Sequence, residues 1–139
     1  MCKILQGRGI PTFVAASTNG SSNIDYLVTE ILGPSLEDLF VFCGKKFSLK
    51  TSLMLFHQLI SLFETVHSKR LIHRDIKPAN FLMGIGANSD VVHMIDYGLV
   101  RKYESKTTGE HIPFGFNKCL IGTAQYASIN AHKGFQLSR

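Results

Sequence analysis

The sequence has no tryptophan and only three cysteines, and it contains no block of five like charges. The cysteines, Cys2, Cys43 and Cys119, are odd in number, widely spaced and outside any C-x-x-C pair. This argues against a disulfide framework and against a zinc site. No apolar run approaches the roughly 20 residues of a membrane span, and the first 30 residues hold no apolar stretch of signal-peptide length. We therefore expect an intracellular protein without a membrane span, located in the cytoplasm, and the sequence leaves residence in the nucleus open.

The composition is that of one globular domain. The chain has 139 residues, of which 45% are hydrophobic, and its formal net charge is +5. Residues 69–118 carry eight basic and five acidic side chains, whereas residues 1–68 carry five of each. The basic excess is moderate and dispersed, so we expect no nucleic acid partner. It favours a surface that attracts phosphate groups or acidic peptides.

Sequence periodicity predicts several elements in the first half of the chain. Residues 12–16 and 24–30 have strand character, and the polar linker between them contains Asn19-Gly20-Ser21, which predicts a hairpin. Ser35-Leu36-Glu37-Asp38 is similar to a capping box and predicts a short helix that ends at Gly44. Apolar residues spaced by three or four predict a long amphipathic helix over residues 50–68, with this stripe: Leu53, Phe56, Ile60, Phe63 and Val66. Short strands are expected within 71–84 and 91–95, and the long loop over 98–122 is expected to be functional or disordered.

The most informative motif is H-R-D-I-K-P-A-N at residues 73–80, followed by D-Y-G at 96–98. Its five fixed residue types would coincide at about one position in a few million by chance. Phosphoryl transfer needs a carboxylate that orients a hydroxyl and accepts its proton, a role that Asp75 can fill. Lys77 can neutralise the migrating phosphoryl group. Asn80 and Asp96 offer the oxygen ligands that Mg²⁺ prefers, and Gly98 is expected to allow a sharp turn after Asp96.

With these residues the sequence resembles the eukaryotic protein kinases, and Lys77 points to the serine/threonine branch. A small-molecule phosphotransferase would share the Asp and Asn but not the pattern of Arg74 and Lys77. Three segments are similar to the casein kinase I family: L-G-P-S-L-E-D-L-F at 32–40, N-F-L-M-G at 80–84 and G-T-A-Q-Y-A-S-I-N-A-H at 122–132. The S-I-N at 128–130, where most kinases have A-P-E, is distinctive of that family.

The resemblance implies an α+β fold of the two-lobed protein kinase type, present in part. Residues 1–30 would form the end of the small lobe, and residues 31–139 the hinge and the mainly helical large lobe through the activation segment. A complete domain of this family is expected to be a monomer. Its substrates are expected to be proteins with acidic or phosphorylated segments, which agrees with the basic second half of the chain.

The resemblance also implies ATP and Mg²⁺ as cofactors and assigns the residues around them. Thr29 would be the gatekeeper, and backbone groups from Glu30 to Leu32 would bind the adenine edge. Leu82 and Ile95 would contact the ring, and Lys77 would contact the transferred phosphate. Thr123 would place its hydroxyl between Asp75 and Lys77, which completes a catalytic set with Asn80. Asn80 and Asp96 would be the metal ligands.

Some features depart from the family. No G-x-G-x-x-G loop is present, and no strand lysine precedes Thr12, so we expect a partial domain that folds marginally alone and exposes apolar surface. Gln125 stands where the family has an arginine, which puts a preference for phosphorylated substrates in doubt. Tyr97 replaces a phenylalanine and brings a hydroxyl that needs a partner. The alternative interpretation is a truncated, non-catalytic kinase-like protein that acts as a binding module.

Overall fold

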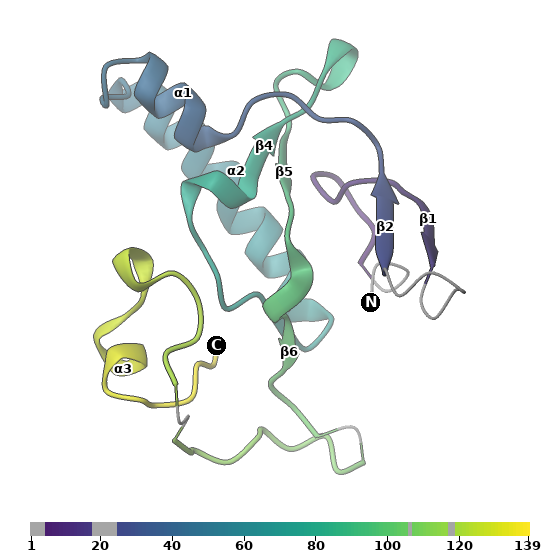
Figure 1. Cartoon of the computed structure of the whole chain (residues 1–139), viewed down its shortest axis with the longest axis vertical. Coiled ribbons are helices and arrows are strands. Elements are labelled where there is room, and N and C mark those ends of the chain that lie inside the picture. Colours follow the sequence, from purple (N-terminus) through teal and green to yellow (C-terminus); the bar gives the residue numbers. More distant parts are fainter. Residues whose placement is uncertain (1–4, 18–24, 106, 117–118) are drawn as a thin grey trace.

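The computed structural model describes residues 5–17, 25–105, 107–116 and 119–139 and has an α+β architecture (Figure 1). Strands β1 (Phe13–Ser17) and β2 (Tyr26–Thr29) form the predicted antiparallel hairpin, with Phe13 opposite Thr29 and Ser17 opposite Tyr26. The predicted turn at Asn19-Gly20-Ser21 lies outside the described residues. All four side chains of β2 are exposed, so this ribbon contributes little to the core.

Helix α1 (Leu36–Phe42) begins at the predicted capping box. The Ser35 hydroxyl accepts from the Asp38 backbone N–H at 3.1 Å, and the Asp38 carboxylate accepts from the Ser35 N–H at 2.9 Å. These bonds satisfy donors that a helix start leaves without intrahelical partners. The helix ends at Cys43, and Gly44 follows with a φ of 68°, a conformation that glycine adopts without steric cost.

Helix α2 (Leu49–Ser68) is the longest element, and Ser48 caps its N-terminus. The predicted helix is confirmed, and the predicted stripe is divided between the core and the surface. Leu53, Phe56 and Ile60 are exposed, which confirms the expected exposed apolar surface. Phe63 and Val66 pack in the core, because the remaining elements lie on that side of the helix. Three leucines of the other apolar side pack there as well: Leu55, Leu59 and Leu62.

Four short strands flank the two segments that contain the predicted catalytic and metal residues. Strand β3 (Leu71–Ile72) pairs with β6 (Arg101–Lys102), and β4 (Phe81–Met83) pairs with β5 (Val92–Met94), both antiparallel. Met94 is fully buried and Val92 nearly so, which anchors β5 in the core under α2. The two ribbons hold fixed the ends of the segment 73–80 and the start of the segment after Ile95.

The rest of the second half consists of single turns and one short helix. The 3₁₀ turns are η1 (Pro78–Asn80), η2 (Gly86–Asn88), η3 (Tyr97–Leu99) and η4 (Ala124–Tyr126), and α3 spans Ile129–His132. The long segment predicted over 98–122 contains β6 and a bridge between Glu104 and His111. Among the helices of the described residues, none combines the length and apolarity needed to cross a membrane.

Candidate active site

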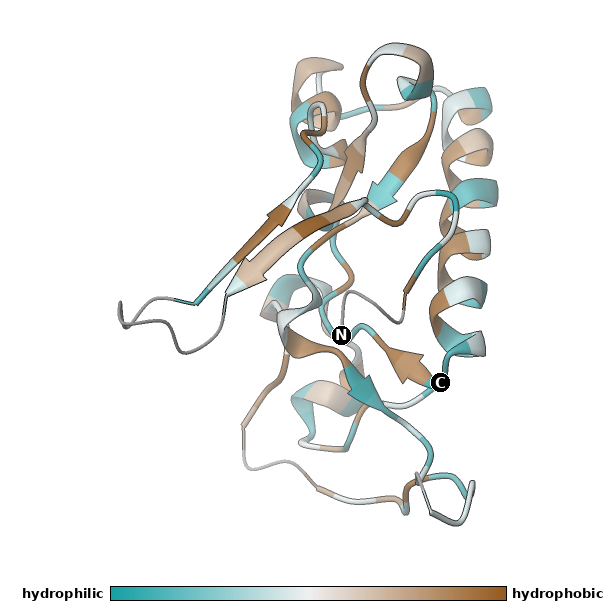
Figure 2. Ribbon diagram, turned by 90° about the vertical axis from the view of Figure 1, so that its right-hand side faces the viewer, coloured by the Kyte–Doolittle hydropathy of each residue, from teal (hydrophilic) through white to brown (hydrophobic). Residues whose placement is uncertain are grey.

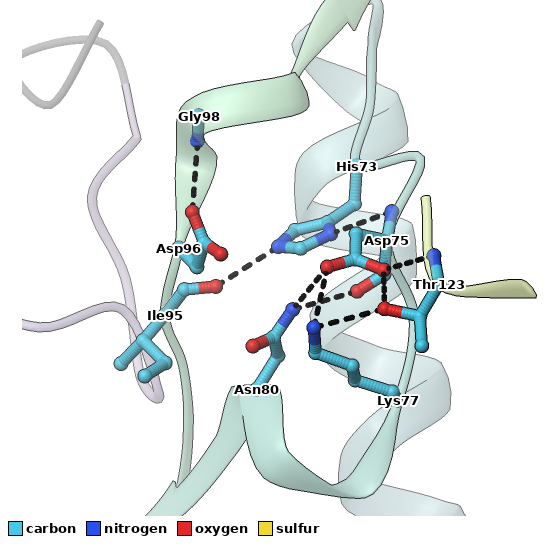
Figure 3. A network of polar contacts seen from close by, with 8 residues as sticks. All are labelled: His73, Asp75, Lys77, Asn80, Ile95, Asp96, Gly98 and Thr123. Atoms are coloured by element: carbon cyan, nitrogen blue, oxygen red, sulfur yellow. Dashed lines mark hydrogen bonds and ion pairs between the residues drawn. The ribbon is translucent and has the colours of Figure 1, made fainter. Parts of the chain in front are cut away.

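His73 connects the two segments that carry the predicted catalytic and metal residues. The residue is 3% exposed. Its Nε2 lies 2.9 Å from the Ile95 carbonyl oxygen, while Nδ1 accepts from the Asp75 backbone N–H at 3.3 Å. Because a carbonyl can only accept, Nε2 carries the proton and Nδ1 does not. Figure 3 shows the ring between Asp75 and the segment of Asp96. His73 is thus a structural link in the site.

Asp75, Lys77 and Thr123 form one bonded network (Figure 3). The Lys77 ammonium lies 2.9 Å from Asp75 Oδ2. The Thr123 hydroxyl donates to Asp75 Oδ1 at 2.7 Å and accepts from Lys77 Nζ at 2.9 Å, so it lies between the two charged groups. The Thr123 backbone N–H adds a third bond to Asp75 Oδ1, at 2.9 Å. The fold thereby brings together residues 48 positions apart.

The carboxyl group of Asp75 is buried, with the residue 7% exposed. Burial alone raises its pKa, but the bonds from Lys77 and Thr123 outweigh burial and lower the pKa to about 2, from an ordinary value of 3.8. Asp75 therefore stays ionised throughout the physiological range. It can accept a hydrogen bond from a further hydroxyl without first losing a proton.

Asn80 is buried beside the same carboxylate, at the end of η1. Its amide nitrogen donates to the Asp75 backbone carbonyl at 2.8 Å and to Asp75 Oδ2 at 3.2 Å. Since both partners are acceptors, the NH₂ group must face Asp75, and the amide oxygen is turned away from it (Figure 3). That oxygen is the atom that could serve as a metal ligand.

Asp96 follows β5 after one intervening residue, Ile95, and adopts a left-handed conformation, with φ at 59° and ψ at 73°. Its Oδ1 accepts from the Gly98 backbone N–H at 3.2 Å. The expected turn after Asp96 is present as η3 (Tyr97–Leu99), which contains Gly98, but the positive φ belongs to Asp96 and not to Gly98. Glycine at position 98 avoids a close contact, since a Cβ there would lie 3.2 Å from Asp96 Oδ1.

The predicted nucleotide contacts line one cavity of about 560 Å³. Its lining includes Glu30, Leu32, Leu82 and Ile95 together with Asp96. The Glu30 carboxylate accepts from the Thr12 backbone N–H at 2.6 Å, which lowers its pKa. Lys77, which the resemblance also associated with the cofactor, is not in this lining and belongs to the Asp75 network.

A second cavity, of about 360 Å³, lies on the other side of the catalytic motif and is lined by Asp75, Thr123, Arg74 and Tyr126 among others. Burial, and then the like charge of Arg101, lower the pKa of the Arg74 guanidinium, while Arg101 itself lines a separate cavity together with Lys102. The Arg74 side chain also donates to the Leu99 carbonyl at 2.6 Å. This cavity is thus lined by the ionised carboxylate of Asp75 and by the side chains of Arg74 and Arg139.

Several supporting residues had no clear signal in the sequence. Gly122 has a φ of 93°, and a Cβ there would lie 2.5 Å from the Arg74 carbonyl oxygen, so only glycine lets Thr123 reach Asp75. The Tyr97 hydroxyl, which needed a partner, donates to the Met94 carbonyl at 2.7 Å. The lining of the cavity of about 560 Å³ also includes four apolar residues that precede β2, and their apolar character is the only sign of this role in the sequence: Leu5, Ile10, Pro11 and Phe13.

The buried Asp75 is bonded to Lys77 and Thr123, and two side chains that can bind a metal through oxygen follow it in the chain, Asn80 and Asp96. This arrangement in an α+β chain has the features of a phosphoryl-transfer site. Comparison with known families agrees with this class. The sequence matches the family model described as the protein kinase domain over residues 4–130. The chain belongs to the protein kinase domain family.

Proposed function

We propose that the protein is an ATP-dependent serine/threonine protein kinase of casein kinase I type, which transfers the γ-phosphoryl group of ATP to serine or threonine hydroxyls of proteins. The observation that carries the proposal is the network of Asp75, Lys77 and Thr123 in a member of the protein kinase family. A threonine hydroxyl bonded to both charged groups fixes their orientation before any substrate arrives. Such preorganisation is the main contribution a protein makes to phosphoryl transfer.

In this proposal Asp75 accepts a hydrogen bond from the substrate hydroxyl and aligns its oxygen for attack. With a pKa near 2, Asp75 is a weak base. Its main task is orientation, and it accepts the proton once the oxygen has begun to bond to phosphorus. Lys77, whose side chain is 24% exposed, can reach the transferring phosphoryl oxygens and offset their charge.

The residues present fit a magnesium ion. Asp96 offers a carboxylate and Asn80 an amide oxygen that is turned away from Asp75. No group of three or more His, Cys, Asp or Glu side chains in the described residues could hold a metal by itself. Mg²⁺ needs no such group, because it binds to one or two protein oxygens and completes its shell with phosphate and water. When bound, the ion supplies positive charge to the phosphates.

For ATP we propose the cavity of about 560 Å³. Leu82 and Ile95 offer apolar surface for the adenine ring, while backbone groups from Glu30 to Leu32 recognise its edge. The hydrogen bond from the Thr12 backbone N–H to the Glu30 carboxylate supports this assignment, because it holds the Glu30 side chain at the start of β1 and leaves recognition of the adenine edge to the backbone. In the same proposal residues 1–30 end the small lobe of a two-lobed kinase, and residues 31–139 form the hinge and the large lobe.

The casein kinase I assignment rests on the segments at 32–40, 80–84 and 122–132 and above all on S-I-N at 128–130. Acidic substrates are supported by Arg74 and Arg139, which line the same cavity as Asp75, and by the like charge of Arg101 that acts on Arg74. Lys106 and Lys118, which could add to this charge, lie outside the described residues. The proposal also includes a cytoplasmic location, with residence in the nucleus left open.

A non-catalytic binding module is the second candidate, and one observation favours it. Among the described residues that line the larger cavity are Glu30 and Asp96, but no lysine or arginine. A triphosphate would thus meet two carboxylates there without a compensating cation from the protein, and its affinity would depend on Mg²⁺. A chain that binds partners without turning over ATP would show the same fold.

The test is phosphate transfer from γ-labelled ATP by the purified chain, with Mg²⁺, to matched peptides that differ only in the acceptor and in flanking charge. We expect labelling of serine and threonine peptides, stronger with acidic flanks, and none of the tyrosine peptide. Transfer to tyrosine would contradict the serine/threonine assignment. Partner binding without labelling of any peptide would favour the binding module.

A further inference from the structure

A cavity of about 480 Å³ lies beside the one of about 560 Å³, and the two share Ile10 and Glu30 in their linings. Figure 1 and Figure 2 show β4 and β5 between helix α2 and the β1–β2 ribbon. The cavity lies where the segment 7–12, which precedes this ribbon, and Glu30, which follows it, meet β5 and the turn η2. We call it the polar cavity, since polar or charged side chains from each of these parts line it.

His93 is the buried polar side chain of the polar cavity, and the residue is 5% exposed. The side chains of its neighbours Val92 and Met94 lie in the core, so the His93 ring lies on the opposite face of β5. Its Nδ1 is 3.1 Å from the Val91 carbonyl oxygen, and a carbonyl can only accept, so Nδ1 carries the proton. The neutral ring therefore offers a lone pair at Nε2, which has no hydrogen-bond partner among the described residues.

Glu30 gives the polar cavity its negative charge. Its Oε1 accepts from the Thr12 backbone N–H at 2.6 Å, and none of the ion pairs formed within the described residues includes Glu30. The cavity is also lined by Arg8 and Asp90, but these two form a pair of opposite charges at 4.0 Å. One carboxylate therefore stays uncompensated, beside a ring nitrogen that can accept a hydrogen bond.

The walls that hold these two acceptors are fixed by backbone contacts. The Met94 N–H donates to the Gly9 carbonyl at 2.9 Å, and the Glu30 N–H donates to the Thr12 carbonyl at 3.0 Å. Gly9 has a φ of 79°, and a Cβ there would lie 2.5 Å from the Val92 carbonyl oxygen, so only glycine allows this close approach to β5. A ligand thus meets a preformed site and need not order it.

The acceptors select the class of ligand. In the described part of the chain no group of three or more His, Cys, Asp or Glu side chains could hold a metal ion, and an anion would meet the Glu30 carboxylate. We propose that the polar cavity binds a guanidinium group, carried by a small compound or by an arginine side chain of a protein. A guanidinium has five N–H donors in a planar fork, which can serve Glu30 and His93 at once, whereas an ammonium is a compact point charge. This inference goes beyond the kinase function and does not depend on it.

The test is an NMR titration of the purified chain with ethylguanidinium, followed on the backbone amides of residues 88–93 at constant ionic strength. We expect saturable shifts with a Kd of about 1 to 10 mM, which is ordinary for so small a ligand. Ethylurea has the same shape without the charge and should cause no shifts, and ethylammonium should bind at least about threefold more weakly. A blocked glycine-arginine-glycine tripeptide that binds more tightly than ethylguanidinium would identify a protein arginine as the ligand, and weaker binding a free guanidine compound.

Two variants test the acceptors. Glu30→Gln keeps an oxygen for the Thr12 N–H but removes the charge, and it should raise the Kd about tenfold. His93→Phe keeps a ring without Nε2 and should raise the Kd about threefold. Glu64→Gln, at an exposed glutamate of α2 outside the cavity, is the matched control and should leave the Kd unchanged. The proposal is overturned if ethylguanidinium causes no shifts up to about 50 mM, if ethylurea or ethylammonium binds as tightly, or if Glu30→Gln has no effect.

Discussion

Removal of the Thr123 hydroxyl offers a quantitative test of the catalytic network. Thr123→Val keeps the shape of the side chain but removes the bonds to Asp75 Oδ1 at 2.7 Å and from Lys77 Nζ at 2.9 Å. Hydrogen bonds to charged groups contribute about 1.5 to 3 kcal/mol each, and the lost hydroxyl no longer has to be desolvated. Since Asp75 keeps its ion pair with Lys77 and the Thr123 backbone bond, we expect a net loss of about 2 kcal/mol in the free energy of unfolding.

The same variant should change the response to acid. The folded-state pKa of Asp75 is about 2, below its ordinary value of 3.8, so the network stabilises the fold fully above about pH 4. This contribution, roughly 2 kcal/mol, is lost as the pH falls through about 2. Without the hydroxyl the pKa should rise toward its ordinary value, and the acid-dependent part of the stability should shrink.

The assay is urea unfolding of the chain, its Thr123→Val variant and its Thr123→Ser variant, each at neutral pH and in acid. Serine retains the hydroxyl and is the matched control, so it should cost well under 1 kcal/mol. The reasoning is refuted if valine and serine are equally stable at neutral pH, or if the difference between them does not diminish in acid.

Three further predictions concern single residues. Asp96→Ala should abolish the increase in ATP affinity that Mg²⁺ produces while leaving affinity without Mg²⁺ nearly unchanged, as measured by calorimetry; an unchanged Mg²⁺ effect would remove Asp96 from the metal site. Tyr97→Phe deletes the bond to the Met94 carbonyl and should lower the free energy of unfolding by about 1 kcal/mol, which thermal melts would detect; an unaltered melt would show that this bond contributes nothing. Arg101→Ala should raise KM more for acidic than for neutral peptides, and equal effects on both would contradict the electrostatic argument.

Local signals explain why parts of the fold were predictable. The capping box of Ser35 and Asp38 involves residues three apart, so it can be recognised without knowledge of the tertiary structure. The extent of α2 was predictable for the same reason. Both sides of the helix are apolar, which predicts burial on more than one side, but only the position of the strands determines that Leu55, Leu59 and Leu62 pack on the core here while three residues of the other side are exposed: Leu53, Phe56 and Ile60.

In the candidate site, too, the local sequence predicts some features, whereas others depend on tertiary contacts. The residues of the motif at 73–80 are contiguous, and their chemistry follows from their types. Thr123 lies far along the chain and was placed only by resemblance, because no local pattern announces a contact across 48 residues. Asp96 precedes a turn that contains Gly98, as expected, but the left-handed conformation of Asp96 itself was not predicted; its short carboxylate can accept from the Gly98 N–H. Elements as short as β6 and η4 depend on tertiary contacts and leave little trace in the sequence.

The central claim is that Asp75 orients the acceptor hydroxyl in phosphoryl transfer. The most direct measurement compares γ-phosphate transfer by the chain, by Asp75→Asn and by Asp90→Asn, a control at an exposed aspartate whose nearest cation, Arg8, is 4.0 Å away. We predict that Asp75→Asn lowers kcat by about a thousandfold or more and leaves the Kd for ATP within about threefold, while Asp90→Asn has no effect. Turnover by Asp75→Asn equal to that of the unaltered chain would contradict the account.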